Sequence, residues 1–197
     1  MAAFSIVCCH SLLGQATLAK DLPASRKQSL VLYIGGGFSR YVAPIFIQAA
    51  GVKTAITRVG PSGTIRLMWQ PQFRLRLGIE TGFCNFYSYN LQNGNTTGKV
   101  SLSAIPLMVV WSMPVVKRLD IFAGFGSYIL TSKLDYNGKV NAKSFSLGTS
   151  IALAYKVPVS KTTAIAAEVK WMDAFQTKDD VISAEIRLVW KFLQWER

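Results

Sequence analysis

The body of this sequence lacks any long run of apolar residues. Half of its 197 residues are hydrophobic and only 16% are charged, a composition typical of a membrane protein rather than a soluble one. A transmembrane helix needs a run of about 18 or more apolar residues, and none occurs after the N-terminal segment. Because the apolar residues are spread over short segments instead, the sequence predicts a protein that crosses a membrane with β-strands.

The N-terminal segment has the features of a secretory signal peptide. Ala2 to Leu13 is an apolar stretch, and Ala16 to Ala19 supplies small residues at a cleavage site before Lys20. We therefore expect residues 1–19 to be a signal peptide, residues 20–28 a short N-terminal segment and residues 29–197 the folded body.

Histidine and cysteine are scarce, and the expected cleavage makes them scarcer. It would remove His10, Cys8 and Cys9 and leave Cys84 as the single cysteine. A disulfide within the mature chain then has no second partner. Histidine-based zinc sites and Ser-His or Cys-His catalysis have no histidine to use. We expect no metal, no cofactor and no catalytic residues.

Acidic residues are also few, with 10 Asp and Glu against 22 Lys and Arg, for a net charge of +12. The basic residues are scattered singly through the chain and do not form a patch or helical stripe of the kind that binds nucleic acid. We therefore expect no nucleic-acid partner. Attraction to anionic lipid head groups or lipopolysaccharide accounts better for the excess charge.

The pattern that is present from Ser29 onward is a period of two. Its clearest example is Phe73 to Tyr87, where apolar residues alternate with Arg74, Arg76 and Glu80. This alternation exceeds the usual soluble strand of about 5–6 residues and matches the 9–11 residues of a tilted strand that crosses a bilayer. Eight such strands are predicted: Ser29–Tyr41, Gly63–Gln70, Phe73–Tyr87, Lys99–Trp111, Leu119–Thr131, Lys143–Tyr155, Thr162–Trp171 and Val181–Phe192.

Prolines indicate how the predicted strands are connected. Pro71, Pro114 and Pro158 lie in short connections after the second, fourth and sixth strands, 43 and 44 residues apart, which is a hairpin-sized repeat. Pro106 falls inside the fourth strand, where we expect a β-bulge. The other connections are longer and are predicted to be surface loops on the opposite side, as in outer-membrane barrels: Ala43–Val59, Leu91–Gly98, Asp135–Val140 and Asp173–Asp180.

Aromatic residues gather at both ends of the predicted strands, as they do at the two interfaces of a bilayer. We interpret them as two girdles. The short-turn side has Trp69, Trp111, Tyr155, Trp190 and Phe192, and the long-loop side has Phe38, Tyr41, Phe83, Tyr87, Tyr128 and Trp171.

With these features the sequence resembles the small eight-stranded outer-membrane barrels of the OmpX, OmpA transmembrane-domain and OmpW kind. The resemblance covers Ser29 to Arg197 and rests on pattern. It implies an all-β, eight-stranded, antiparallel up-and-down transmembrane β-barrel in the outer membrane of a Gram-negative bacterium. Such chains often end on an aromatic residue that presents them to the barrel-assembly machinery. Here Phe192 and Trp195 are near the end, but Glu196 and Arg197 depart from that pattern.

If the apolar faces point to lipid, charged residues collect inside the barrel. An eight-stranded barrel is only wide enough for side chains to fill it, and buried charges need partners. We therefore predict an ion network in the lumen, of Arg66, Arg74, Arg76, Glu80, Glu168, Lys170, Glu185 and Arg187. The alternative, that these carboxylates are a general acid/base pair, is disfavoured because no nucleophile or metal is expected beside them.

Gly35 to Gly37 lacks the Lys-Ser/Thr and the helix of a phosphate-binding loop, so we interpret these glycines as sites of strand curvature or close packing.

Three functions remain open at this stage. The first is a non-enzymatic outer-membrane barrel that acts through its surface loops or as a component of an envelope assembly, with envelope proteins as partners. The second is a narrow or laterally opening channel for small or apolar solutes. The third is a soluble lipocalin-like barrel with an apolar ligand inside, which would need apolar residues inward and charged residues outward.

Overall fold

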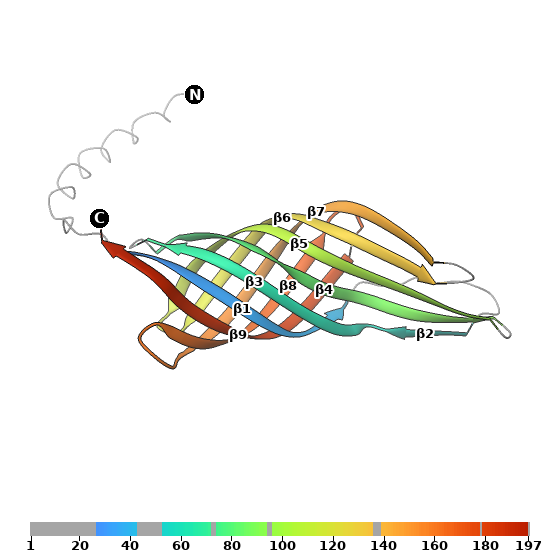
Figure 1. Ribbon diagram of the computed structural model, residues 1–197, viewed down its shortest axis with the longest axis horizontal. Helices are drawn as coiled ribbons and strands as arrows, with labels where there is room; N and C mark the ends of the chain where they lie inside the picture. Colours follow the sequence, from blue (N-terminus) through green and yellow to red (C-terminus); the bar gives the residue numbers. More distant parts are fainter. Residues whose placement is uncertain are drawn as a thin grey trace, which may run out of the picture.

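The computed structural model describes residues 27–42, 53–71, 74–93, 96–135, 139–177 and 179–196. The predicted signal peptide lies outside these ranges. No helix in the described part of the chain is long and apolar enough to cross a membrane. The described residues form nine strands (Figure 1): β1 Lys27–Tyr41, β2 Lys53–Thr57, β3 Val59–Gln70, β4 Arg76–Asn93, β5 Thr96–Val116, β6 Leu119–Asp135, β7 Lys139–Pro158, β8 Thr163–Ala174 and β9 Asp179–Glu196.

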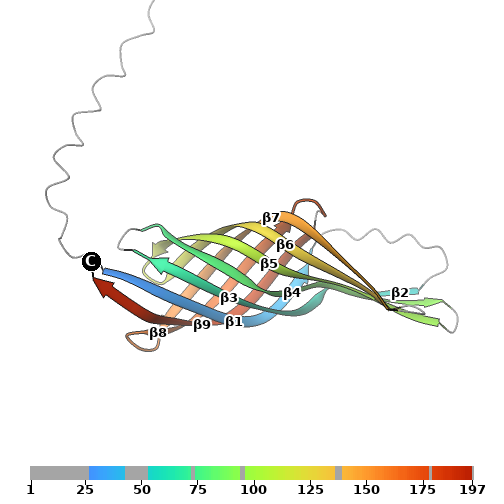
Figure 2. The same cartoon turned by 45° about the horizontal axis from the view of Figure 1, so that its top comes forward.

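The strands form one closed antiparallel sheet. Neighbours follow the order β2-β4-β3-β1-β9-β8-β7-β6-β5, and pairing of β4 with β5 closes the circle. β2 and β3 are separated only by Arg58 and pair with successive parts of β4, so they occupy one place in the wall. The fold is therefore an up-and-down barrel with eight strand positions, as predicted. Figure 2 shows β2, β4 and β5 extending beyond the other strands at the end opposite the C-terminus.

Several predicted loops are strands at this extended end. Residues 53–57, inside the predicted loop 43–59, form β2, and residues 91–93 and 96–98 belong to β4 and β5, whose register continues to Asn93 opposite Thr96. The prediction of one long loop over Leu91–Gly98 was therefore wrong. Backbone pairing between adjacent strands overrides the low strand preference of the Asn and Gly residues in this stretch.

Pro71 directly follows β3 and lies in the β3–β4 connection, as predicted, but the other two short turns are displaced from their prolines. The β5–β6 turn is Lys117–Arg118, so Pro114 lies within β5 next to a register shift, and Pro158 is the last residue of β7. Proline lacks a backbone N–H, and a strand tolerates it at an irregularity or at its end. These prolines thus mark the approach to a turn rather than the turn itself.

The predicted bulge at Pro106 is absent from the described ladder. The β5–β6 register passes through Pro106, opposite Tyr128, without a shift. On the β4 side, pairing is interrupted between Leu107 and Ala104, and the bulge lies in β4 between Asn85 and Tyr87. The missing N–H is accommodated by this gap in the ladder.

Side chains alternate along the barrel-forming parts of the strands, with apolar residues outward. In β9, Ile182, Ile186, Leu188 and Trp190 are exposed, whereas Glu185 and Arg187 between them are buried. This orientation is the reverse of a lipocalin-like barrel and matches a barrel whose outer face meets lipid. The predicted girdle residues Trp69, Trp111, Tyr155, Trp171, Trp190 and Phe192 are all exposed on this face.

Tyr41 and Tyr128 correct the predicted girdle on the long-loop side. Both are buried, at 5% and 1% exposure. Tyr41 shares the inward parity of Tyr33, and Tyr128 that of Phe122, because successive side chains of a strand point to opposite faces. They therefore fill the lumen instead of facing lipid.

Gly35 and Gly37 lie on the inward face of β1 beside β9. A Cβ on Gly35 would come within 2.3 Å of Arg187 Cγ, and one on Gly37 within 1.9 Å of the Ala184 carbonyl oxygen. Close packing against β9 explains these two glycines, and it leaves room in the lumen for the large charged side chains of that strand.

Candidate functional site

A network of six charged side chains occupies the middle of the lumen. It contains three cations and three carboxylates, and each side chain is at most 2% exposed. We call this set the central network: Arg66 of β3, Glu80 of β4, Glu168 and Lys170 of β8, and Glu185 and Arg187 of β9.

Arg66 joins two carboxylates from different strands. Its Nη1 and Nη2 donate to the two oxygens of Glu168 at 3.0 and 2.9 Å, a bidentate pair. Its Nε donates to Glu80 Oε2 at 2.5 Å. The guanidinium also lies over the ring of Phe122, 4.1 Å from its centroid. Planar two-point pairing and an aromatic face are both favourable for a buried guanidinium.

Lys170 connects opposite walls of the barrel. Its Nζ donates to Glu80 Oε1 at 2.5 Å. Lys170 belongs to β8 and Glu80 to β4, and these strands are four places apart in either direction around the eight positions. The two bonded side chains together therefore reach across the lumen from opposite strands.

Arg187 completes the network from β9. Its Nη2 is 2.8 Å from Glu168 Oε1 and 2.8 Å from Glu185 Oε2. Thr64 donates a hydrogen bond of 2.7 Å to the same Glu185 oxygen. Because taking an ion out of water costs several kcal/mol unless it is paired, the equal numbers of positive and negative groups are what permits this burial.

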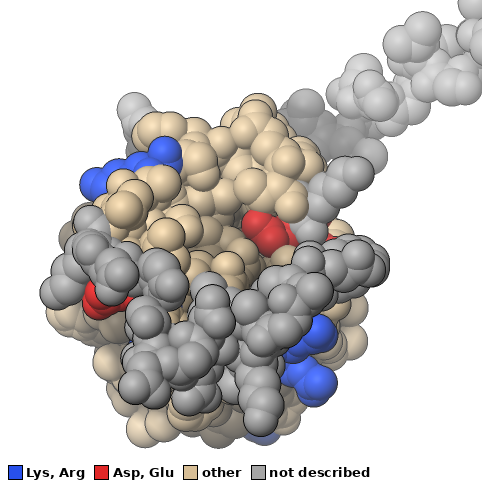
Figure 3. Space-filling view, turned by 90° about the vertical axis from the view of Figure 1, so that its right-hand side faces the viewer, with Lys and Arg blue, Asp and Glu red and all other residues tan. Residues whose placement is uncertain are grey.

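Aromatic and apolar side chains fill the lumen on the long-loop side of the central network. The rings of Tyr41 and Phe86 lie 6.4 Å apart between centroids. The Tyr41 hydroxyl donates to Asp179 Oδ1 at 2.7 Å, and the Tyr128 hydroxyl donates to the Thr149 carbonyl at 2.9 Å. Figure 3 looks onto this end of the molecule, where the described atoms are mainly uncharged. A second layer thus narrows the lumen beyond the ions.

A separate charged cluster lies at the short-turn end. Asp120 of β6, with a side chain 2% exposed, accepts from Arg76 Nη1 at 3.2 Å and pairs with Lys156 of β7. The two cations are about one-fifth exposed. This cluster has no ion pair with the central network among the described residues.

The eight predicted network residues divide into three groups. Six form the central network, and Arg76 belongs to the short-turn cluster instead. Arg74 lies outside both clusters: it is exposed and precedes the first residue of β4, so its predicted place in the lumen was wrong. Arg74 precedes the paired part of the chain, because pairing with β5 begins at Arg76 and pairing with β3 at Leu77.

The sequence reasoning missed Asp120 and Lys156. Both follow from the alternation, because Ile121 and Leu153 face outward and place Asp120, Ala154 and Lys156 on the inward face. Neither residue stands in a motif, and only the extension of the parity to the strand ends would have found them.

The chemistry open to these carboxylates is restricted by their partners. Glu80, Glu168 and Glu185 are all paired with cations. No group of three or more His, Cys, Asp or Glu side chains within the described ranges is arranged to hold a metal ion. The geometry is that of a crosslink between strands.

Comparison with known proteins identifies the fold. No family model matches the chain, and no curated protein sequence matches it. Among solved structures, the outer membrane protein OprG from Pseudomonas aeruginosa is 12% identical to this chain, with a TM-score of 0.50. The superposed region covers 84% of this chain and 97% of the OprG chain. Ail of Yersinia pestis, the attachment invasion locus protein, is 7% identical over 85% of this chain and 99% of its own, with a TM-score of 0.49. The outer membrane protease OmpT from Escherichia coli is 10% identical over 86% and 97%, with a TM-score of 0.42.

The chain therefore has the fold of an integral outer-membrane β-barrel. Its apolar exterior is the lipid-facing surface of that fold. At this level of identity the likeness to OprG describes architecture alone.

Proposed function

We propose that this protein is a non-enzymatic outer-membrane barrel with a closed lumen, which acts through the surface at its long-loop end or as a component of an envelope assembly. The observation that carries the proposal is the bond between Lys170 and Glu80, whose side chains together reach across the lumen from opposite strands. Paired, buried side chains that cross the lumen support the proposal because they occupy space that a continuous water path would need at that level.

The absence of free catalytic groups in the central network supports the non-enzymatic part of this proposal. A general acid or base needs a proton that can reach substrate. Glu80 and Glu168 are instead enclosed by Arg66, Lys170 and Arg187, with their side chains at most 2% exposed.

The extended strands support a role for the long-loop end. β4 and β5 continue as a paired ribbon to Asn93 and Thr96, and β2 pairs along β4 as far as Gln92. A rigid strand scaffold that holds projecting segments is a common way to present binding residues. This end would face the outer leaflet, with lipopolysaccharide around it, and assembly would depend on the barrel-assembly machinery acting at the other end.

Planar-bilayer recording of the purified protein tests the closed lumen. We expect no reproducible single-channel steps from the native protein. The triple variant Arg66→Ala, Glu80→Ala and Lys170→Ala removes the side chains that cross the lumen, two positive and one negative. We expect this variant to pass ions. Heat-modifiable gel mobility checks that it has folded.

The matched control is Arg40→Ala with Asp135→Ala and Lys143→Ala, three exposed residues near the long-loop end with the same charges. Steady steps from the native protein would contradict the proposal. They would make a narrow channel for small solutes the function instead.

A further inference from the structure

A basic pocket opens at the short-turn end of the lumen, on the far side of the central network from the loops. Its volume is about 370 Å³. Six cations line it, contributed by three strands and two turns: Arg76, Lys117, Arg118, Lys156, Lys161 and Lys191. We call this the turn-end pocket.

The positive charge of the turn-end pocket is not balanced by the described residues. Asp120 pairs with both Arg76 and Lys156, which leaves the local charge strongly positive. Lys117, Arg118 and Lys161 are exposed and make no ion pair with any described residue. Like charges brought together at a pocket mouth raise the local concentration of anions.

Side chains in the inner part of the pocket are held in position by contacts with other protein groups. Asp120 holds Arg76 and Lys156 in place, and Tyr33, fully buried, closes the floor. Gln70 Nε2 donates to the Tyr33 hydroxyl at 3.3 Å, so that hydroxyl keeps its own hydrogen for an acceptor. A guanidinium, ammonium groups and a hydroxyl donor converge on one volume.

We propose that the turn-end pocket binds a multivalent phosphate-bearing anion. Phosphate oxygens accept several hydrogen bonds at once and pair strongly with Arg and Lys. The volume exceeds that of a single phosphate group and falls at the small end of ligand pockets, about 300–1,000 Å³. The phosphate can come from a soluble molecule in the periplasm or from a phospholipid head group at the inner leaflet.

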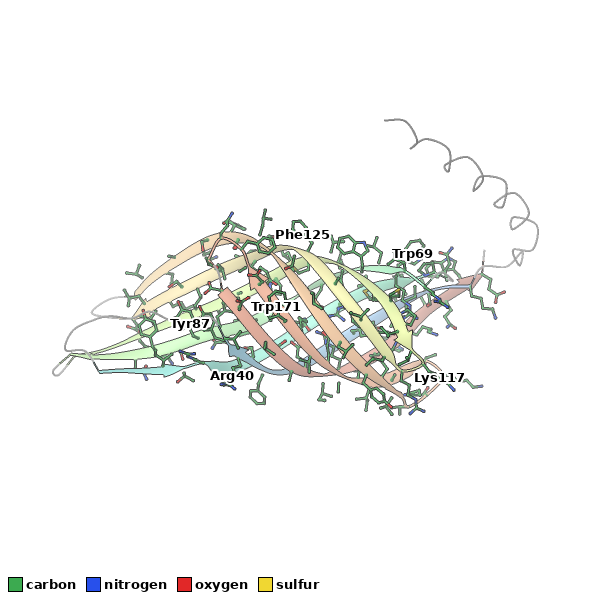
Figure 4. All side chains as sticks on the ribbon, turned by 180° about the vertical axis from the view of Figure 1, so that it is seen from behind. Arg40, Trp69, Tyr87, Lys117, Phe125 and Trp171 are labelled. Carbon is green, nitrogen blue, oxygen red and sulfur yellow. The ribbon has the colours of Figure 1, made fainter. Side chains whose placement is uncertain are left out.

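The position of the pocket makes it independent of the loop-based role. Figure 4 shows Lys117 at one end of the barrel and Arg40 farther along toward the opposite end. The central network separates this pocket from the long-loop end. A binding result here therefore says nothing for or against conduction, and the two proposals fail separately.

Calorimetric titration of the full protein with tripolyphosphate, in nanodiscs of phosphatidylcholine, a zwitterionic lipid with no net charge, tests the proposal. We expect saturable binding by the native protein that weakens with added salt, since exposed charges are screened over about 8–10 Å. The variant Lys117→Gln with Arg118→Gln and Lys161→Gln should raise the dissociation constant about tenfold or more, equivalent to about 1.4 kcal/mol.

The control is Arg40→Gln with Lys133→Gln and Lys143→Gln, which removes the same charge from exposed residues at the long-loop end. We expect it to bind tripolyphosphate as the native protein does. No saturable binding by the native protein, or equal weakening in both variants, would overturn the proposal.

A second series with nanodiscs containing phosphatidylglycerol distinguishes the two sources of phosphate. The comparison is between the native protein and the variant Lys117→Gln with Arg118→Gln and Lys161→Gln. If the anionic lipid weakens tripolyphosphate binding more for the native protein than for this variant, the site takes a lipid head group. If it does not, the site takes a soluble phosphate compound. Both outcomes keep the site and assign its ligand.

Discussion

The central network and the turn-end pocket lie in the same barrel and use the same types of charged residue. The first has equal numbers of positive and negative groups, whereas the second has an excess of positive groups. The central network has three cations and three carboxylates. The turn-end pocket has six cations, and Asp120 is the carboxylate bonded to two of them. Side chains of the first are at most 2% exposed, whereas Arg76 and Lys156 of the second are about one-fifth exposed.

The difference follows from access to water. A charge fully enclosed in the barrel must be compensated by protein groups, because its desolvation costs several kcal/mol. A charge at the mouth keeps part of its hydration and can stay unpaired. Paired ions in the middle therefore link strands, and unpaired ions at the end remain available for a ligand.

The largest effect should come from breaking the central network. Glu80→Ala leaves Arg66 and Lys170 without their closest shared partner, and we expect the free energy of unfolding to fall by about 3–5 kcal/mol, the usual cost of orphaning a buried ion. Denaturant unfolding in detergent measures it. Asp135→Ala, an exposed carboxylate at the end of β6, is the control and should change little. An unchanged midpoint for Glu80→Ala would mean that the middle of the lumen is hydrated like its mouth.

A smaller effect is expected at Asp120, which joins the buried and the exposed regions. Asp120→Asn should lower the free energy of unfolding by about 1–2 kcal/mol, because its two partners retain contact with water. The same change should tighten tripolyphosphate binding, since it removes a negative charge beside the pocket. Weaker binding after this substitution would show that Asp120 acts mainly by holding Arg76 and Lys156 in position.

The smallest effect belongs to the ion pair on the surface. Lys27 Nζ lies 3.2 Å from Glu196 Oε1, with side chains 79% and 59% exposed. Lys27→Gln should change the free energy of unfolding by at most about 0.5 kcal/mol, because exposed pairs are screened and mobile. The same denaturant experiment checks it, and a loss comparable with that of Glu80→Ala would contradict the dependence of an ion pair's contribution on its burial.

Much of the wall could be predicted because strand alternation is a local property. The parity around Glu80, Glu168 and Arg187 places charged residues on one face and large apolar residues on the other, whichever strands are neighbours. Arg74 shows the limit of this reasoning: its parity is correct, but it lies before the strand begins. Pro106 shows another, since its local preference for a bulge is met by a gap in pairing with β4.

The sequence by itself determined that the chain forms strands, which faces carry charge and that the lumen must hold mixed ions. Only the tertiary structure decided which ions meet. Arg66 and Glu168 are 102 positions apart in the chain, and Lys170 reaches Glu80 because closure of the sheet sets β8 opposite β4. The same closure separates Arg76 from the network that its parity suggested and places it beside Asp120. The physical reason is that parity depends on each strand alone, whereas pairing across the lumen depends on register and on the closure of the whole circle of strands.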